Sequence, residues 1–195
     1  QARMGSTRLP GKVMKMINGI PIIELIVKRL KKSREANEVV VATSKQPENK
    51  VLINHLKKTK TKIFCGSEND VLDRFYKAAN KFRAKIVVRI TGDCPVVDVG
   101  LIDNFIRKFK NKKPDYLSNC FPPTFSDGLD IEIFSFDLLK KIAKKAKLKH
   151  RISGGVLISY LRDKDNYKKI KKINIECSDK KAHNYRICVD EEIDL

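Results

Sequence analysis

The sequence lacks tryptophan, and only 7% of its 195 residues are aromatic. Its longest apolar runs, such as residues 20–23 and 39–42, are far shorter than the roughly 20 residues that a membrane-spanning helix needs. With 42% hydrophobic residues, the chain is nevertheless too apolar to be disordered. Length and composition therefore predict one domain with a sizeable core and no membrane span.

Paired cysteine motifs are also missing. The five cysteines contain no C-x-x-C pair, and the three histidines stand far apart, so neither offers the ligand spacing of a zinc site. An odd number of scattered cysteines argues for reduced thiols in a cytosolic protein. We therefore expect a cytoplasmic location and no disulfide among Cys65, Cys94, Cys120, Cys177 and Cys188.

Acidic residues are scarce: 23 Asp and Glu face 42 Lys and Arg, a formal net charge of +19. Such an excess is typical of a nucleic-acid or membrane-surface patch. However, many lysines fall on predicted helix faces, and no basic run is interleaved with aromatic residues, as single-strand binders require. We favour solvated helix faces and no nucleic-acid partner, and keep a basic nucleic-acid-binding domain as an alternative.

Apolar runs alternate with helical patterns along the chain, which predicts βα units. The expected helices are residues 21–33, 47–58, 69–82, 98–110, 136–146 and 152–162. The expected strands are residues 38–43, 62–65, 85–91, 116–118, 130–134, 170–175 and 185–189. No repeat or linker interrupts the pattern, so we expect one α/β domain with a mostly parallel sheet flanked by helices.

The first segment that suggests chemistry is residues 1–12, QARMGSTRLPGK. Glycine permits close backbone approach to a ligand, and basic side chains neutralise phosphate oxygens. The segment is not a Walker-type loop, because Val13 stands where that loop has its metal-binding hydroxyl. We favour polyphosphate binding over a basic surface loop. The polar groups are Arg3, Ser6, Thr7, Arg8 and Lys12.

The second segment, residues 91–98, follows the strongest predicted strand. Ligands of open α/β sheets bind beyond the carboxyl ends of the strands, so Asp93 is placed to hold Mg²⁺. The alternative is a turn aspartate. We expect Asp98 to cap the next helix and Cys94 to pack beneath the Asp93 turn.

The third segment is the predicted strand at residues 185–189, which ends at Asp190. Asp190 could bring a second carboxylate beside Asp93. It could equally be the N-cap of a helix that starts at Glu191. The spacing alone leaves both interpretations open.

Six stretches together resemble the cytidylyltransferase family, over nearly all of the chain and in the expected order. They are QARMGSTRLPGKVM, VVATS, VLDRFYKAA, VVRITGDCPVVD, SDGLDIEIFSF and RICVDEEIDL. The resemblance is greatest to the spore coat polysaccharide biosynthesis protein F branch. It is more distant to the synthetases of CMP-sialic acid and CMP-3-deoxy-manno-octulosonate.

The resemblance implies a Rossmann-like nucleotidyltransferase fold. In that family a strand precedes the position of Gln1 and a helix follows that of Leu195, so residues 1–195 are expected to be a single domain trimmed at both ends. The residues implied to hold the nucleotide are Arg3, Ser6, Arg8, Lys12 and Arg74. Those implied to hold Mg²⁺ are Asp93 and Asp190. Those implied near the acceptor are Asp127, Asp130 and Glu132.

Two of these roles have equally plain alternatives: Arg74 could lie on a helix surface, and Asp127 could form a turn with Gly128. The implied reaction is attack by a sugar oxygen on the α-phosphorus of CTP, with release of pyrophosphate. Such transfers depend on positioning and charge neutralisation, the catalytic roles implied for Arg3, Lys12 and Asp93.

The expected partners are CTP and a small sugar, an acidic one destined for surface polysaccharide, and a homodimer is left open. Residues 150–160 depart from the family pattern, which leaves the identity of the sugar open. A glycosyltransferase on a related fold is the second hypothesis. It ranks lower because its usual Asp-x-Asp metal motif is replaced here by Gly92-Asp93-Cys94.

Overall fold

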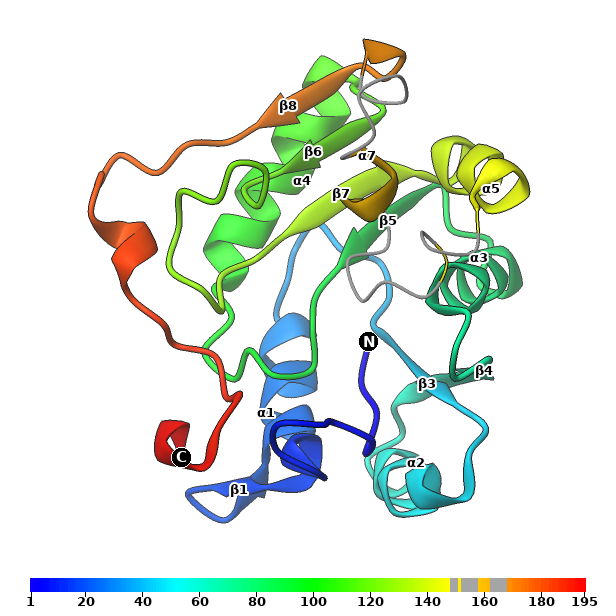
Figure 1. Ribbon diagram of the computed structural model, residues 1–195, viewed down its shortest axis with the longest axis vertical. Helices are drawn as coiled ribbons and strands as arrows, with labels where there is room; N and C mark the ends of the chain where they lie inside the picture. Colours follow the sequence, from blue (N-terminus) through cyan, green and yellow to red (C-terminus); the bar gives the residue numbers. More distant parts are fainter. Residues whose placement is uncertain (148–150, 152–157, 162–167) are drawn as a thin grey trace.

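Helices and strands alternate in the computed structural model, which describes residues 1–147, 151, 158–161 and 168–195 (Figure 1). The helices are α1 (Ile22–Leu30), α2 (Lys50–Lys58), α3 (Val71–Lys81), α4 (Val99–Lys112), α5 (Phe136–Lys145) and α7 (Ile158–Leu161), with 3₁₀ turns η1 (Lys12–Met14), η2 (Pro47–Asn49), η3 (Ala182–Asn184) and η4 (Glu192–Asp194). The strands are β1 (Met16–Ile17), β2 (Ile20–Pro21), β3 (Val40–Ser44), β4 (Lys62–Gly66), β5 (Ile86–Arg89), β6 (Tyr116–Ser118), β7 (Glu132–Ser135) and β8 (Lys172–Asn174). Within the described residues, no helix is both long and apolar enough to cross a bilayer.

Three of the four strands in the larger sheet run in one direction. The strand order is β5-β7-β6-β8, with β7 antiparallel to β5 and β6 and with β8 parallel to β6. A separate pair, β3 and β4, is parallel. The α/β architecture expected from the sequence is therefore confirmed, with β7 as an inserted antiparallel strand.

The first two residues of the chain lie between β3 and the end of β5 (Figure 1). The amino nitrogen of Gln1 donates to the carbonyl of Ile90 at 2.8 Å, and the amide of Ala2 donates to the carbonyl of Ala42 at 3.2 Å. The basic loop that follows is thereby fixed at the carboxyl ends of both strands, where a ligand of an open α/β sheet is expected.

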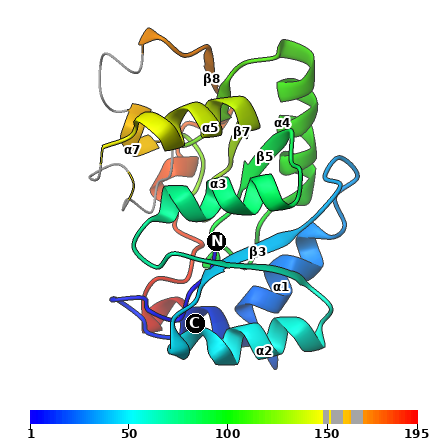
Figure 2. The same cartoon turned by 90° about the vertical axis from the view of Figure 1, so that its right-hand side faces the viewer.

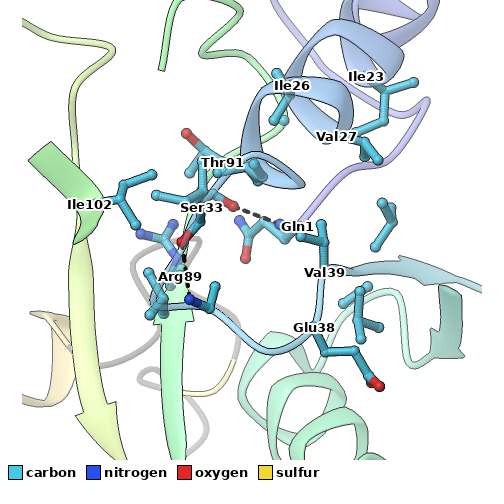
Figure 3. Close-up of a pocket in the computed structure, with 18 of the residues that line it drawn as sticks. Gln1, Ile23, Ile26, Val27, Ser33, Glu38, Val39, Arg89, Thr91 and Ile102 are labelled. Atoms are coloured by element: carbon cyan, nitrogen blue, oxygen red, sulfur yellow. Dashed lines mark hydrogen bonds between the residues drawn. The ribbon is translucent and has the colours of Figure 1, made fainter. Parts of the chain in front are cut away.

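An apolar pocket of about 120 Å³ lies beside Gln1, between α1, β3 and β5. Figure 3 shows aliphatic side chains of α1 and the β3 segment in its wall, with Thr91 and Arg89 among the few polar ones. Its lining is typical of a protein core. The expected nucleotide is multiply charged and would lose its hydration there for few polar partners, so we expect its site elsewhere.

Side chains alternate across the larger sheet and bury both of its faces. In β7, Ile133 packs in the cluster that includes α1 and α4, whereas the next residue, Phe134, packs in the cluster of α3 and α5. In β6, Leu117 packs in the cluster that includes α1 and α4, and Tyr116 packs in the cluster of α3 and α5. Figure 2 shows α3 and α5 side by side on one face. Because both faces are covered, every residue of β6 and the first three residues of β7 are buried.

Local sequence signals fix the starts of the helices. The carboxylates of Asp70 and Asp98 accept hydrogen bonds at 2.8 Å from the amides of Asp73 and Leu101, and these bonds cap α3 and α4. The N-cap role expected for Asp98 is therefore confirmed. Ser135 caps α5 in the same way.

Two sequence expectations differ from the structure. Residues 185–189 form no strand but an extended segment with one isolated bridge, between Asp127 and Arg186. Their amides and carbonyls bond to loops instead, as where the amide of Ile187 donates to the carbonyl of Asp127 at 2.8 Å. A short hairpin of β1 and β2 was not expected. The predicted helix at residues 152–162 lies largely outside the described residues, although α7 falls at its end.

A buried ion pair connects three strands of the sheet. The guanidinium of Arg89 in β5 donates to one carboxylate oxygen of Glu132 in β7, and the hydroxyl of Tyr116 in β6 donates to the other at 2.9 Å. Glu132 is 0% exposed. The family resemblance implied a position near the acceptor for Glu132, but this burial and these partners put it inside the sheet, so it has no surface for a ligand.

Because Glu132 compensates a buried guanidinium, Glu132→Ala should lower the free energy of unfolding by about 3–5 kcal/mol in urea denaturation. The matched change Glu176→Ala removes an exposed carboxylate that pairs with Lys180 at 3.5 Å. It should change stability by less than about 0.5 kcal/mol. Equal effects of the two substitutions would show that the buried pair does not stabilise the sheet.

Candidate active site

A polar cleft of about 290 Å³ opens at the carboxyl end of β5. The N-terminal loop forms one wall, and the start of α3 with the turn at residues 91–93 forms the other. The residues of the cleft that the sequence nominated for the nucleotide or metal are Arg3, Ser6, Arg8, Lys12, Arg74 and Asp93. Sequence positions up to ninety residues apart therefore meet in one cleft.

The N-terminal loop is closed by its own backbone. The carbonyl of Met4 accepts hydrogen bonds from the amides of Ser6 at 2.9 Å and Gly11 at 2.8 Å. Gly11 has a φ of 72°, a conformation that L side chains rarely adopt. The amide of Met4 donates to the buried side chain of Asn49 at 2.9 Å. This closure directs Lys12, the first residue of η1, into the protein.

The ammonium of Lys12 joins the two carboxylates that the sequence nominated as metal ligands. Lys12 Nζ donates to Asp93 Oδ2 at 2.7 Å and to Asp190 Oδ1 at 2.6 Å. Arg8 adds an ion pair with Asp190 Oδ2 at 2.8 Å. Lys12 is only 8% exposed and Asp190 only 7%. The structure thus brings Asp93, Asp190 and two of the predicted phosphate-binding cations into direct contact.

The ammonium of Lys12 and the carboxylate of Asp93 stabilise each other's charged form. Burial acts to lower the pKa of the Lys12 ammonium, but its hydrogen bonds to Asp190 and Asp93 outweigh burial and raise that pKa. Burial acts to raise the pKa of Asp93, but the hydrogen bonds from Lys12 and then Thr91 lower it below its usual value. Both groups are therefore charged at neutral pH.

A backbone hydrogen bond holds Asp190 beside Asp93. The amide of Val189 donates to the carbonyl of Asp93 at 2.8 Å. The alternative role of Asp190, as a helix cap, is not observed, because the side chain of Glu191 caps η4. Both carboxylates face a single cationic nitrogen, and carboxylate oxygens are the ligands that Mg²⁺ prefers, so this donor set fits Mg²⁺.

Three of the remaining nucleotide candidates have different surroundings. Arg3 pairs with Glu68 at 2.5 Å. Arg74 is 2% exposed and donates to the carbonyls of Ser67 and Glu68, which decides against a helix-surface role. Burial and then nearby Arg3 lower the Arg74 pKa, with Glu68 opposing. Ser6 accepts a hydrogen bond from the amide of Leu9 at 3.3 Å within the loop.

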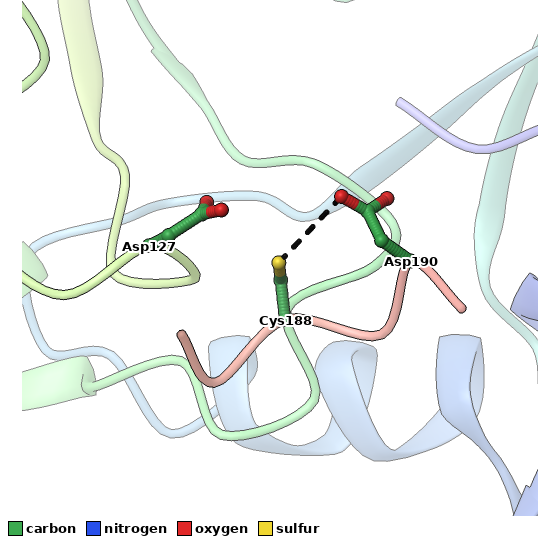
Figure 4. A group of neighbouring side chains, drawn as sticks. All are labelled: Asp127, Cys188 and Asp190. Atoms are coloured by element: carbon green, nitrogen blue, oxygen red, sulfur yellow. Dashed lines mark hydrogen bonds between the residues drawn. The ribbon is translucent and has the colours of Figure 1, made fainter. Parts of the chain in front are cut away.

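Asp127, from the expected acceptor segment, lies close to Asp190. Figure 4 shows Asp127 and Asp190 on either side of Cys188, and their potential ligand atoms all lie within 4.8 Å of one another. Burial, and then the charge of Asp127, raise the pKa of Asp130. The place of Cys188 beside these carboxylates was not predicted from the sequence, although residues 188 and 190 of an extended segment share a side.

All five cysteines have free thiols, which confirms the sequence prediction. Cys94 is buried directly beside the Asp93 turn, as expected, and its sulfur lies 3.0 Å from the hydroxyl of Thr91. Burial raises the pKa of the Cys94 thiol, and burial with Asp127 raises that of Cys188 to about 12. Neither thiol is a reactive nucleophile.

The α/β fold and the basic loop that faces two carboxylates define a nucleotidyltransferase-type protein. The structure of CMP:2-keto-3-deoxy-manno-octonic acid synthetase complexed with CTP shares the fold at a TM-score of 0.64 and 15% identity, over 90% of this chain and 88% of that one. A cytidylyltransferase from Leptospira borgpetersenii superposes at a TM-score of 0.90 with 32% identity, over 98% of this chain and 79% of that one.

Sequence comparison assigns the chain to one family within this fold. The family model described as cytidylyltransferase matches residues 1–195, and the chain belongs to that family. The spore coat polysaccharide biosynthesis protein SpsF of Bacillus subtilis is 31% identical over 200 residues, which cover 100% of this chain and 80% of SpsF. An uncharacterized protein of Methanocaldococcus jannaschii, MJ1063, is 38% identical over 77% of this chain. The match spans 61% of that relative's length.

The environment of the thiols predicts their reactivity. Alkylation in denaturant without reductant should add five labels per chain by intact mass. Under native conditions at about pH 8, Cys94 and Cys188 should react more slowly than the half-buried Cys177, because burial and raised pKa values suppress their thiolates. In denaturant the rates should converge. A missing label would reveal a disulfide, and fast native labelling of Cys188 would contradict its environment.

Proposed function

We propose that this protein transfers CMP from CTP to a sugar and releases pyrophosphate. The observation that carries the proposal is that the basic loop meets Asp93 in one cleft and that Lys12 of this loop also contacts Asp190. Family membership supports cytidine as the base. The five free thiols support a reducing compartment, and we place the enzyme in the cytoplasm.

The N-terminal loop neutralises the triphosphate. Arg3, Arg8 and Lys12 line the cleft together and bring three positive charges to phosphate oxygens, where charge accumulates as pyrophosphate leaves. The hydroxyl of Ser6 and the loop amides add neutral donors. Arg74, held by two backbone carbonyls, fixes the opposite wall of the cleft.

Asp93 and Asp190 hold Mg²⁺ in this proposal. The ion would polarise the α-phosphate and neutralise charge on the leaving group. The residues of the chain supply orientation: the Val189–Asp93 backbone hydrogen bond fixes one carboxylate beside the other. The chain needs little covalent chemistry for such a transfer, since positioning and charge neutralisation carry it.

The acceptor approaches from the side of Asp127 and Asp130. Their carboxylates are suited to accept hydrogen bonds from sugar hydroxyls. The name of SpsF refers to spore coat polysaccharide, and a further relative, from Chlorobium chlorochromatii, is named a 3-deoxy-manno-octulosonate cytidylyltransferase, with 33% identity over 65% of this chain and 50% of its own length. These names favour an acidic sugar that is destined for surface polysaccharide.

The direct test incubates the protein with Mg²⁺, each of the four nucleoside triphosphates and a panel of sugars, and measures pyrophosphate. The panel contains neutral sugars beside acidic ones, because Asp127 and Asp130 add negative charge on the acceptor side. We expect sugar-dependent release with CTP. Release with another triphosphate would assign a different base, and no release with any pair would refute nucleotidyl transfer to these sugars.

The role of Asp93 is tested by an isosteric change that removes only its charge. Asp93→Asn should lower turnover by about 10²-fold or more, while calorimetry finds that much of the CTP affinity remains because the basic loop is intact. The matched change Asp98→Asn, five residues along, should keep both turnover and stability, since Asn also caps helices well. Full activity of Asp93→Asn would remove Asp93 from the site.

A further inference from the structure

The contacts of Lys12 are unusual for a residue assigned to phosphate. Although Lys12 lines the cleft, its ammonium lies 2.7 and 2.6 Å from one oxygen each of Asp93 and Asp190. The side chain is largely buried at this position. Two carboxylates in such proximity repel each other unless a cation lies between them, and here Lys12 is that cation.

The same two carboxylates are those proposed to hold Mg²⁺. The ion needs oxygens at about 2.1 Å, and an ammonium already in contact with those oxygens both blocks the approach and repels a second positive charge. Arg8 adds further repulsion, since it contacts the other oxygen of Asp190. A divalent ion that arrives alone therefore competes with two cations of the protein for one pair of carboxylates.

We infer that Lys12 is an exchangeable internal counter-ion that excludes divalent cations from Asp93 and Asp190 until a polyphosphate draws it away. The polyphosphate step rests on the proposed function. Lys12 and Arg8 line the cleft in which the phosphates would bind, so both cations can exchange carboxylate partners for phosphate oxygens there. A lysine suits this exchange, because its ammonium is a compact charge on a flexible stem.

The exchange makes nucleotide and metal binding mutually dependent. Phosphates that attract Lys12 free the carboxylates for the ion, and an ion that displaces Lys12 frees the ammonium for phosphate. By thermodynamic linkage each ligand raises the affinity for the other to the same extent. The enzyme would thus take up metal and nucleotide together instead of binding metal alone.

The test measures binding of Mn²⁺, an oxygen-preferring ion with a paramagnetic signal, without any nucleotide. The wild-type protein should bind it weakly. Lys12→Gln removes the charge but keeps two hydrogen-bond donors for the carboxylates, and should bind Mn²⁺ at least about tenfold more tightly. Lys12→Arg, which keeps the charge, should stay weak. Lys15→Gln, which removes an exposed lysine paired with Glu192, should match the wild type.

The gain in Mn²⁺ affinity must depend on the carboxylates of Asp93 and Asp190. Adding Asp93→Asn to Lys12→Gln should therefore abolish this gain. If Lys12→Gln fails to fold by thermal denaturation, Lys12→Met offers a second uncharged side chain of similar length. Equal Mn²⁺ affinity of wild type and a folded uncharged variant would overturn the inference. Micromolar Mn²⁺ binding by the wild type alone would overturn it without any variant.

These outcomes are separate from those of the proposed function. A variant that gains Mn²⁺ affinity while the wild type shows no CTP-dependent pyrophosphate release would support the internal counter-ion and refute nucleotidyl transfer from CTP to the sugars tested. CTP-dependent pyrophosphate release by the wild type, with no gain in Mn²⁺ affinity in the uncharged variants, would support nucleotidyl transfer and refute the internal counter-ion.

Discussion

The need to compensate two neighbouring carboxylates governs the active end of this molecule. Asp93 and Asp190 come from segments almost a hundred residues apart, and Lys12 reaches both from the N-terminal loop. The loop closure at Met4, the left-handed Gly11 and the backbone bond from Val189 to Asp93 all serve to bring these three charges together. Each is understandable only as part of that arrangement.

A second compensated charge lies behind the first. Arg89 ends β5, four residues before Asp93, and its partner Glu132 begins β7, two residues after Asp130. The pairing of Arg89 with Glu132 therefore fixes the positions of two strand ends. Asp93, the candidate metal ligand, follows one of them, and Asp130, the candidate acceptor residue, precedes the other. The pair of Arg89 and Glu132 supplies precise alignment, and the ion pairs of Lys12, which lines the cleft, supply groups that can change partners.

Much of this arrangement was predictable from the sequence. Helical periodicity and caps such as Asp98 located the helices, and the βα alternation with the rule that ligands bind beyond strand ends selected the basic loop and Asp93. The hairpin of β1 and β2 was missed although Asn18-Gly19, both at positive φ, is a strong turn signal.

The rest depended on tertiary partners. Residues 185–189 have a strand-like pattern, but loops occupy the positions where a neighbouring strand would pair. Glu132 lies in an acidic stretch with Asp127 and Asp130, and only the position of Arg89 reveals that it points inward. Likewise, a basic residue in a glycine-rich loop gives no sign of whether its first partner is a phosphate or a carboxylate.

The long sequence separation between Lys12 and Asp190 has a consequence for biosynthesis. Their contact spans 178 residues. At roughly 5–20 residues per second, the ribosome delivers Asp190 on the order of ten seconds or more after Lys12. The basic loop therefore receives its acidic partner only once Asp190 has been added, and a chain terminated before Asp190 would carry the loop without the acidic residue that neutralises it.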